Sequence, residues 1–115
     1  QAFAPGMCKA GSGVITNTAS VLAKSPLPVA AAYAASKAGL QSIVASYADE
    51  MENTTVRALC VDPGAMRTRL RAQAFVGEDP STLPEPAVIA PMMLELARPD
   101  REPPRGVVRF GDWSA

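Results

Sequence analysis

The sequence predicts an α/β fold in which about three parallel strands alternate with crossover helices. Two apolar segments, Gly13–Thr18 and residues 56–61, lack polar alternation, as expected of parallel strands that are covered on both faces. The segment between them has apolar residues at helical spacing, over about residues 29–51. A strand, a helix and a second strand in this order indicate a parallel sheet with a helical connection.

The central helix is bounded by prolines and has one apolar face. Residues 1–11 before the first strand favour the end of a helix and a turn, and Pro26 and Pro28 break the chain ahead of the central helix. Its buried face is predicted from residues at helical spacing, namely Leu40, Ile43, Val44, Tyr47 and Met51. Small residues on the same helix permit close approach by another helix.

The C-terminal third contains a long connection and three shorter elements. Residues 65–86 have no clear periodicity, and a connection of this length in a compact domain is usually a functional lid or a disordered segment. We expect a short helix at 68–74 within it, then a helix at 85–97 and a last strand at 107–110. Trp113 is interpreted as a packing residue.

Three arginines in the long connection leave two interpretations open. Arg67, Arg69 and Arg71 could bind an anionic substrate or a cofactor phosphate, or they could form a solvated face. The solvated face is the favoured interpretation of such charges.

Composition excludes several classes of function. The 11 basic and 11 acidic residues balance, and there is no basic stripe with interleaved aromatics, which argues against a nucleic-acid partner. The chain has no histidine, so Ser-His-Asp hydrolysis, Cys-His chemistry and ordinary zinc sites are not expected. Cys8 and Cys60 are too few for a disulfide framework or a metal site, and Cys60 is expected to be a buried, inert thiol. No membrane-spanning run and no signal peptide are found, so we expect a soluble, cytoplasmic protein.

Tyr33 and Lys37 form a candidate acid/base pair. They are four residues apart on the central helix, which places them on one face. An ammonium beside a phenol stabilises the negative charge that remains when the phenolic proton leaves, and Ser20 can supply a second hydroxyl to the same substrate oxygen. A tyrosine and a solvated lysine on a surface helix would have the same spacing, so the pair gains weight only from its surroundings.

Those surroundings resemble the catalytic half of the short-chain dehydrogenase/reductase family. The first strand runs into Asn17-Thr-Ala-Ser20, the helix carries Tyr33-Ala-Ala-Ser-Lys37, and the next strand ends in Asp62-Pro-Gly-Ala-Met-Arg-Thr68. The family has these motifs in this order, and the separation of 13 residues between Ser20 and Tyr33 is usual there. Ala19 stands where the first serine of the family's usual pair would be, and Ala23 replaces a common glycine, but neither change removes a catalytic group.

The resemblance implies specific roles for residues of this chain. The catalytic residues would be Ser20, Tyr33 and Lys37, acting in hydride transfer between a carbonyl or alcohol substrate and NAD or NADP. The cofactor-binding residues would be Tyr33, Lys37, Pro63, Gly64, Met66 and Thr68. Met66 departs from the β-branched residue usual at its position. The helix at 29–51 would join two subunits of a homo-oligomer.

The same resemblance implies that residues 1–115 form the C-terminal half of a Rossmann-type doubly wound domain. The glycine-rich turn that cradles a pyrophosphate, the acidic residue that follows it and the Asn-Asn-Ala-Gly stretch are not in this sequence. We therefore expect the 115-residue chain to be inactive by itself. A non-catalytic remnant or an assembly module of the same fold remains the alternative.

Overall fold

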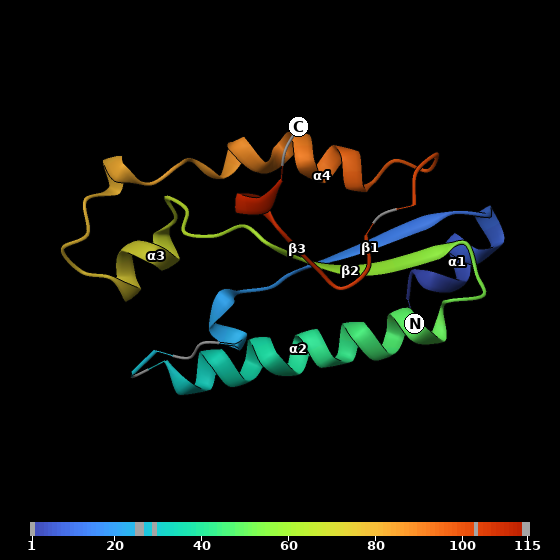
Figure 1. Ribbon diagram of the computed structural model, residues 1–115, viewed down its shortest axis with the longest axis horizontal. Helices are drawn as coiled ribbons and strands as arrows, with labels where there is room; N and C mark the ends of the chain where they lie inside the picture. Colours follow the sequence, from blue (N-terminus) through green and yellow to red (C-terminus); the bar gives the residue numbers. More distant parts are fainter. Residues whose placement is uncertain (1, 25–26, 29, 103, 114–115) are drawn as a thin grey trace.

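The three predicted strands form one parallel sheet in the order β1-β2-β3, as expected from the sequence. The computed structural model describes residues 2–24, 27–28, 30–102 and 104–113. Strand β1 spans Gly13–Thr18, β2 spans Val56–Asp62 and β3 spans Val107–Arg109 (Figure 1). The α/β class and the parallel arrangement of the three strands are both confirmed.

Strand β2 is the centre of the described sheet. It pairs with β1 along its length, from Gly13 opposite Val56 to Thr18 opposite Val61. It pairs with β3 only over its second half, from Cys60 opposite Val107 to Asp62 opposite Arg109. Strand β1 is thus an edge of this sheet, and the carboxyl ends of all three strands lie at the same side.

Helix α2, Ala31–Glu50, covers one face of the sheet. The side chains of Ala58 and Cys60 in β2 pack with Val44 of this helix and with Ala19. Leu40 and Tyr47 pack against this cluster, as predicted, but Ile43 is 68 % exposed, so its placement on the buried face was wrong. Because each residue turns the helix by about 100°, Ile43 lies well to one side of Val44, and the buried face is narrower than we predicted.

The opposite face of the sheet is covered by helix α4, Ala90–Leu96, which follows the 3₁₀ turn η3, Pro86–Ile89. Met92 and Leu96 pack against Leu59 and Val61, which alternate along β2 with the residues facing α2, as the pleat of a strand requires. The helix predicted at 85–97 is thus split. Pro91 explains the split, because a proline has no N–H to continue a helix and is tolerated in its first turn.

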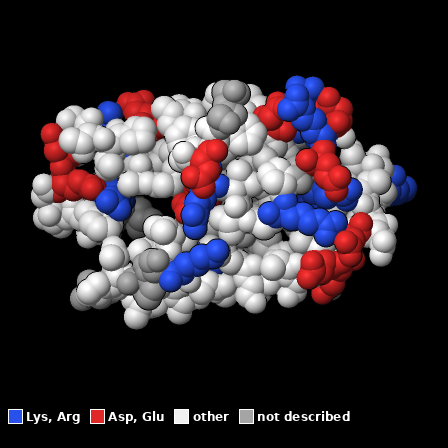
Figure 2. All heavy atoms as spheres, in the orientation of Figure 1, with Lys and Arg blue, Asp and Glu red and all other residues white. Residues whose placement is uncertain are grey.

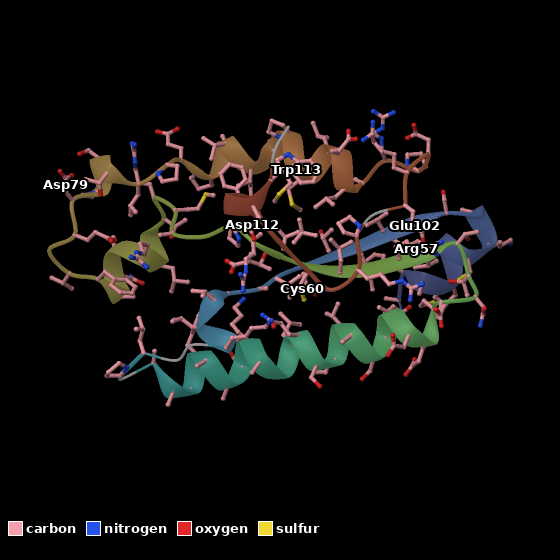
Figure 3. The ribbon with its side chains drawn as sticks, in the orientation of Figure 1. Arg57, Cys60, Asp79, Glu102, Asp112 and Trp113 are labelled. Carbon is pink, nitrogen blue, oxygen red and sulfur yellow. The ribbon has the colours of Figure 1, made fainter. Side chains whose placement is uncertain are left out.

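The last turn of the chain closes this second core. Strand β3 ends at Arg109, one residue earlier than predicted, and Phe110 begins the 3₁₀ turn η4, Phe110–Asp112. Phe110 and Trp113 pack against the cluster beneath α4 (Figure 3). The predicted packing role of Trp113 is confirmed.

Two short helices complete the described fold. Helix α1, Ala4–Ala10, ends at Gly11, which has a φ of 82°, so the predicted helix end before β1 is present. Helix α3, Arg69–Ala74, confirms the short helix predicted in the long connection, and Thr68 caps it by accepting a hydrogen bond from the Arg71 N–H at 3.1 Å. Across the described ranges, no helix combines the length and apolar character that crossing a membrane would need.

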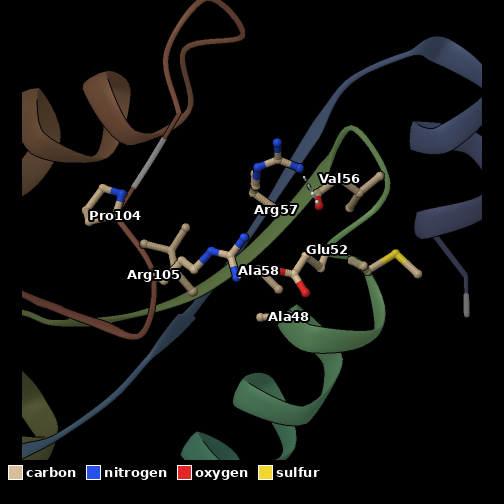
Figure 4. A pocket seen from close by; sticks show the side chains of 9 residues that line it. Ala48, Glu52, Val56, Arg57, Ala58, Pro104 and Arg105 are labelled. Carbon is tan, nitrogen blue, oxygen red and sulfur yellow. Dashed lines mark hydrogen bonds and ion pairs between the residues drawn. The ribbon is translucent and has the colours of Figure 1, made fainter.

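Charged side chains gather at the amino edge of the sheet, near the turn between α4 and β3 (Figure 2). Arg105 of this turn pairs with Glu52 after α2 at 3.1 Å, and Arg57 of β2 lies 3.8 Å from Glu102 (Figure 3). Beneath Arg105 is a cavity of about 20 Å³, little more than the volume that one water needs (Figure 4). These contacts hold the turn against β2, far from the strand ends that carry the candidate site.

Candidate active site

The segment after β1 presents Ser20 at the carboxyl edge of the sheet. Ala19 is 2 % exposed, and its N–H donates to the Val61 carbonyl at 2.7 Å, which extends the ladder one residue past the strand. Ser20 then adopts an extended conformation and caps the 3₁₀ turn η1, Val21–Ala23. Its Oγ accepts a hydrogen bond from the Leu22 N–H at 3.3 Å, and among the described residues its O–H donates to no partner, so it can donate to a ligand.

Helix α2 carries Tyr33 and Lys37 past the end of β1. A helix of 20 residues is about 30 Å long, whereas a strand of six residues spans about 20 Å, so the helix must overhang the strand. The overhang begins near Lys37, whose Nζ donates to the carbonyl of Thr18, the last residue of β1, at 2.8 Å. Tyr33, one turn earlier, is 38 % exposed for this reason although it lies on the face that carries Lys37.

The two helix residues are in contact, and Ser20 lies at the same edge. The Lys37 Nζ is 5.7 Å from the centroid of the Tyr33 ring, within the range of a cation–π interaction. The hydroxyls of Tyr33 and Ser20, both in the described ranges, form no hydrogen bond with each other. The structure therefore brings Tyr33 and Lys37 together and ties Lys37 to the strand that leads to Ser20, but it does not join all three side chains directly.

The turn after β2 places a second group of predicted residues at this edge. Asp62 is 7 % exposed, and its Oδ1 accepts a hydrogen bond from the Gly64 N–H at 3.1 Å. Gly64 has a φ of 74°, which a residue with a Cβ rarely adopts. Pro63 is half-buried, while the Met66 side chain is buried and Thr68 is exposed at the start of α3. Asp62 was not among the predicted site residues, although an Asp two residues before a Gly is typical of a side-chain-capped turn.

The long connection after this turn is held by its own ion pairs. Arg71 binds both carboxylate oxygens of Glu78, at 2.7 and 2.8 Å, and its guanidinium lies 3.6 Å from the centroid of the Phe75 ring. This pairing lowers the pKa of Glu78 below its ordinary value. Arg67 donates to Glu85 at 3.2 Å. Two of the three arginines thus neutralise acidic residues of their own segment, which neither of our interpretations anticipated.

Gln41 makes a contact with the Ser20 backbone that was not predicted from the sequence. Its Nε2 donates to the Ser20 carbonyl at 3.5 Å, and it is one turn beyond Lys37 on α2. Gln41 also borders a groove of about 450 Å³ between α2 and β3, whose lining includes Lys24, Arg109 and Asp112. Cys60 contributes to the apolar lining of this groove, and burial raises the pKa of its thiol, in keeping with the expected inert thiol.

Taken together, the carboxyl edge offers a phenol, an ammonium and a hydroxyl near the ends of two adjacent strands. In an open parallel sheet this edge is where ligands bind. A phenol that is paired with an ammonium can exchange a proton with a bound oxygen, and a second hydroxyl can donate to the same oxygen. The arrangement suits proton transfer at a carbonyl or an alcohol.

Comparison with known proteins identifies the family to which the chain belongs. The short chain dehydrogenase family model matches residues 1–79. The uncharacterized oxidoreductase YciK of Escherichia coli is 37 % identical over 100 residues, which are 87 % of this chain and 39 % of that protein. A dehydrogenase/reductase SDR family protein 7-like of Drosophila melanogaster is 40 % identical over 81 residues, 70 % of this chain and 25 % of that protein.

Solved structures of short chain dehydrogenases share the fold of this chain. A short chain dehydrogenase of Salmonella enterica serovar Typhi superimposes with a TM-score of 0.87 at 34 % identity, over 95 % of this chain and 45 % of that one. A short chain dehydrogenase of Escherichia coli complexed with NADPH has a TM-score of 0.86 at 34 % identity, with the same coverage. This chain spans less than half the length of each of these relatives. By the family match and the shared fold, it belongs to the short-chain dehydrogenase/reductase family of oxidoreductases.

Proposed function

We propose that residues 1–115 are the catalytic half of an NAD(P)-dependent oxidoreductase domain that interconverts a carbonyl and an alcohol by hydride transfer. The observation that carries this proposal is the position of Lys37, which lies beside the Tyr33 ring and donates to the end of β1. That single side chain fixes the phenol-bearing helix against the strand that leads to Ser20. The membership in an oxidoreductase family supports the same reaction class.

Each of the three residues has a defined task in this proposal. In the reductive direction Tyr33 donates its phenolic proton to the substrate oxygen, and in the oxidative direction it accepts that proton. Lys37 stabilises the negative charge that develops on the phenolic oxygen as the proton leaves. Ser20 donates its free O–H to the substrate oxygen and so holds the carbonyl in place. The hydride is supplied or accepted by the nicotinamide of a bound cofactor.

The residues at the carboxyl edge fit the nicotinamide end of such a cofactor. An ammonium has three N–H donors, and within the described part of the chain Lys37 uses one of them on Thr18, which leaves two for ribose hydroxyls. The Gly64 turn has open space where a Cβ would stand, so a ligand can approach its backbone closely. Thr68, Pro63 and the backbone of Met66 belong to the same turn and would hold the carboxamide. The NADPH bound to the Escherichia coli structure makes NADPH the first cofactor to test.

The alternative proposal is a non-catalytic module that joins copies of the chain through α2. The observation that favours it is Ile43, which exposes 68 % of its surface on this helix. An active oxidoreductase can also associate through this helix, so the two proposals are separated by activity and not by oligomeric state.

The proposal is tested in a chimera in which this chain replaces the matching segment of the Escherichia coli relative YciK, so that the upstream half of the domain is present. We expect NADPH-dependent reduction of an aldehyde or ketone panel. We expect Tyr33→Phe to lower kcat by about 100-fold or more, the usual contribution of a general acid, with little change in the Kd for NADPH. Tyr47→Phe is the matched control, because Tyr47 lies on the same helix but packs in the core. Full activity in the Tyr33→Phe chimera would refute the assigned proton donor.

A further inference from the structure

One face of α2 follows the segment from the end of β1 to Ser20. Tyr33, Lys37 and Gln41 are spaced four residues apart, so they lie along one line on the helix. Lys37 donates to the Thr18 carbonyl at 2.8 Å, and Gln41 donates to the Ser20 carbonyl at 3.5 Å. Two successive turns of the helix that carries Tyr33 thus bind the backbone of the segment that carries Ser20.

The Ser20 carbonyl is shared between two donors. It accepts the Ala23 N–H at 3.0 Å, which closes the 3₁₀ turn η1, and it accepts the Gln41 amide on its other side. A carbonyl oxygen has two lone pairs, so both are used. The Gln41 contact is therefore a link between η1 and α2, in a partly buried setting.

The need for such a link follows from where the sheet ends. The last ladder contact is the Ala19 N–H to the Val61 carbonyl at 2.7 Å, so Ser20 lies one residue beyond the hydrogen-bonded sheet. Its hydroxyl must nevertheless meet the same substrate oxygen as the Tyr33 phenol, which sits two turns of α2 away from Gln41. A bond of 3.5 Å is long, but contacts in a catalytic site often tighten when a substrate is bound.

We infer that Gln41 is a positioning residue, which holds the Ser20 backbone against α2 and so sets the Ser20 hydroxyl relative to the Tyr33 phenol. This inference rests on the proposed function, because it assigns Gln41 a role in the same reaction. Gln41 does not touch the reacting atoms; it acts through Ser20. The removal of its N–H donors should therefore affect the reaction only as long as Ser20 has a hydroxyl to position.

The first test is amide hydrogen exchange in the chimera, which needs no substrate. Gln41→Met keeps the length of the side chain but has no N–H donor. We expect the Leu22 and Ala23 amides, which are both bonded to Ser20, to exchange about 3–10-fold faster, the effect of losing one hydrogen bond, with no change at Val61. The control is Ser42→Met, which introduces the same residue at the neighbouring exposed position of α2. Unchanged exchange at Leu22 and Ala23 would overturn the inference.

The second test is a double-mutant cycle on kcat. We expect Gln41→Met to lower kcat by about 3–10-fold with KM within about twofold, and to have less than about twofold effect when Ser20→Ala is already present. Loss of the same size in both backgrounds would mean a general structural role and would overturn the positioning role. An inactive unmutated chimera would refute the proposed function instead, while the exchange measurement would still support or overturn the link between Gln41 and Ser20.

Discussion

Two glycines allow the energetic cost of the backbone conformation in the turn after β2 to be measured separately from side-chain packing. Gly64 follows β2 with a φ of 74°, whereas Gly39 lies within α2. A Cβ added at either position would meet no atom within 4 Å. The substitutions Gly64→Ala and Gly39→Ala are therefore chemically identical and sterically free, and they differ only in the backbone conformation that alanine must adopt.

The two changes should have opposite signs. A non-glycine residue in the left-handed region costs about 1–2 kcal/mol, so Gly64→Ala should lower the free energy of unfolding by that amount. Alanine is favoured over glycine inside a helix by about 0.8–1 kcal/mol, so Gly39→Ala should raise it. The two variants should then differ by roughly 2–3 kcal/mol, the sum of these two effects.

Urea unfolding of the two variants, followed by circular dichroism, measures this difference. For a small domain it corresponds to midpoints separated by about 1–2 M urea. The m-values should agree with that of the unsubstituted chain, since neither change alters the surface that unfolding exposes. If Gly64→Ala does not lower the midpoint, the reasoning about the backbone conformation at Gly64 fails. A destabilised Gly39→Ala variant would contradict the open helix position as well.

Three further predictions follow from the described contacts. Cys8 is exposed, whereas Cys60 is buried and its pKa is raised by burial, so iodoacetamide should label Cys8 first and reach Cys60 only after denaturant is added. The ion pair with Arg71 lowers the pKa of Glu78, so its contribution to stability is present above the pKa of an unfolded glutamate and is lost as the pH falls through the lower folded value. Glu78→Gln should therefore destabilise the protein in urea titrations at pH 7, and the difference should shrink as the pH falls below the ordinary pKa of a glutamate; an equal loss at every pH would contradict this. Finally, the 115 residues alone include no glycine-rich phosphate-binding turn, so calorimetry should detect no saturable NADPH binding at micromolar concentration, and tight binding would refute the expectation.

The strands and their coverage on both faces could be predicted from the sequence because these depend on local patterns. Gly13–Thr18 and the following apolar strand have no polar alternation, which is what a strand covered on both faces requires. The structure confirms this, with Ala58 and Cys60 facing α2 and Leu59 and Val61 facing α4. The start of the short helix at Thr68 could be predicted for the same reason, since a capping hydroxyl is a local feature of the sequence.

The side-chain contacts of the site could not be predicted in the same way. Whether Arg71 binds a ligand or Glu78 depends on how residues 75–78 fold back on α3, and no period in the sequence encodes that return. Gln41 reaches a carbonyl 21 positions earlier in the chain, and a glutamine on a helix gives no sign of such a partner. The exposure of Ile43 depends on which residue of α2 lies over the centre of the sheet, which periodicity fixes only to within one neighbouring position.

The two edges of the sheet differ in how much hydrogen-bonding capacity they retain. At the amino edge, Arg105 pairs with Glu52 and Arg57 lies near Glu102, so opposite charges satisfy each other. At the carboxyl edge, Lys37 donates to a backbone carbonyl, which carries no charge to neutralise it and engages one of three N–H donors. Among the described residues Lys37 has no ion-pair partner, so there it keeps its charge and two of its donors. Within the described part of the chain, the amino edge thus uses its charged groups to hold the neighbouring turn, whereas the carboxyl edge keeps donors that, in the proposed function, would bind a substrate and a cofactor.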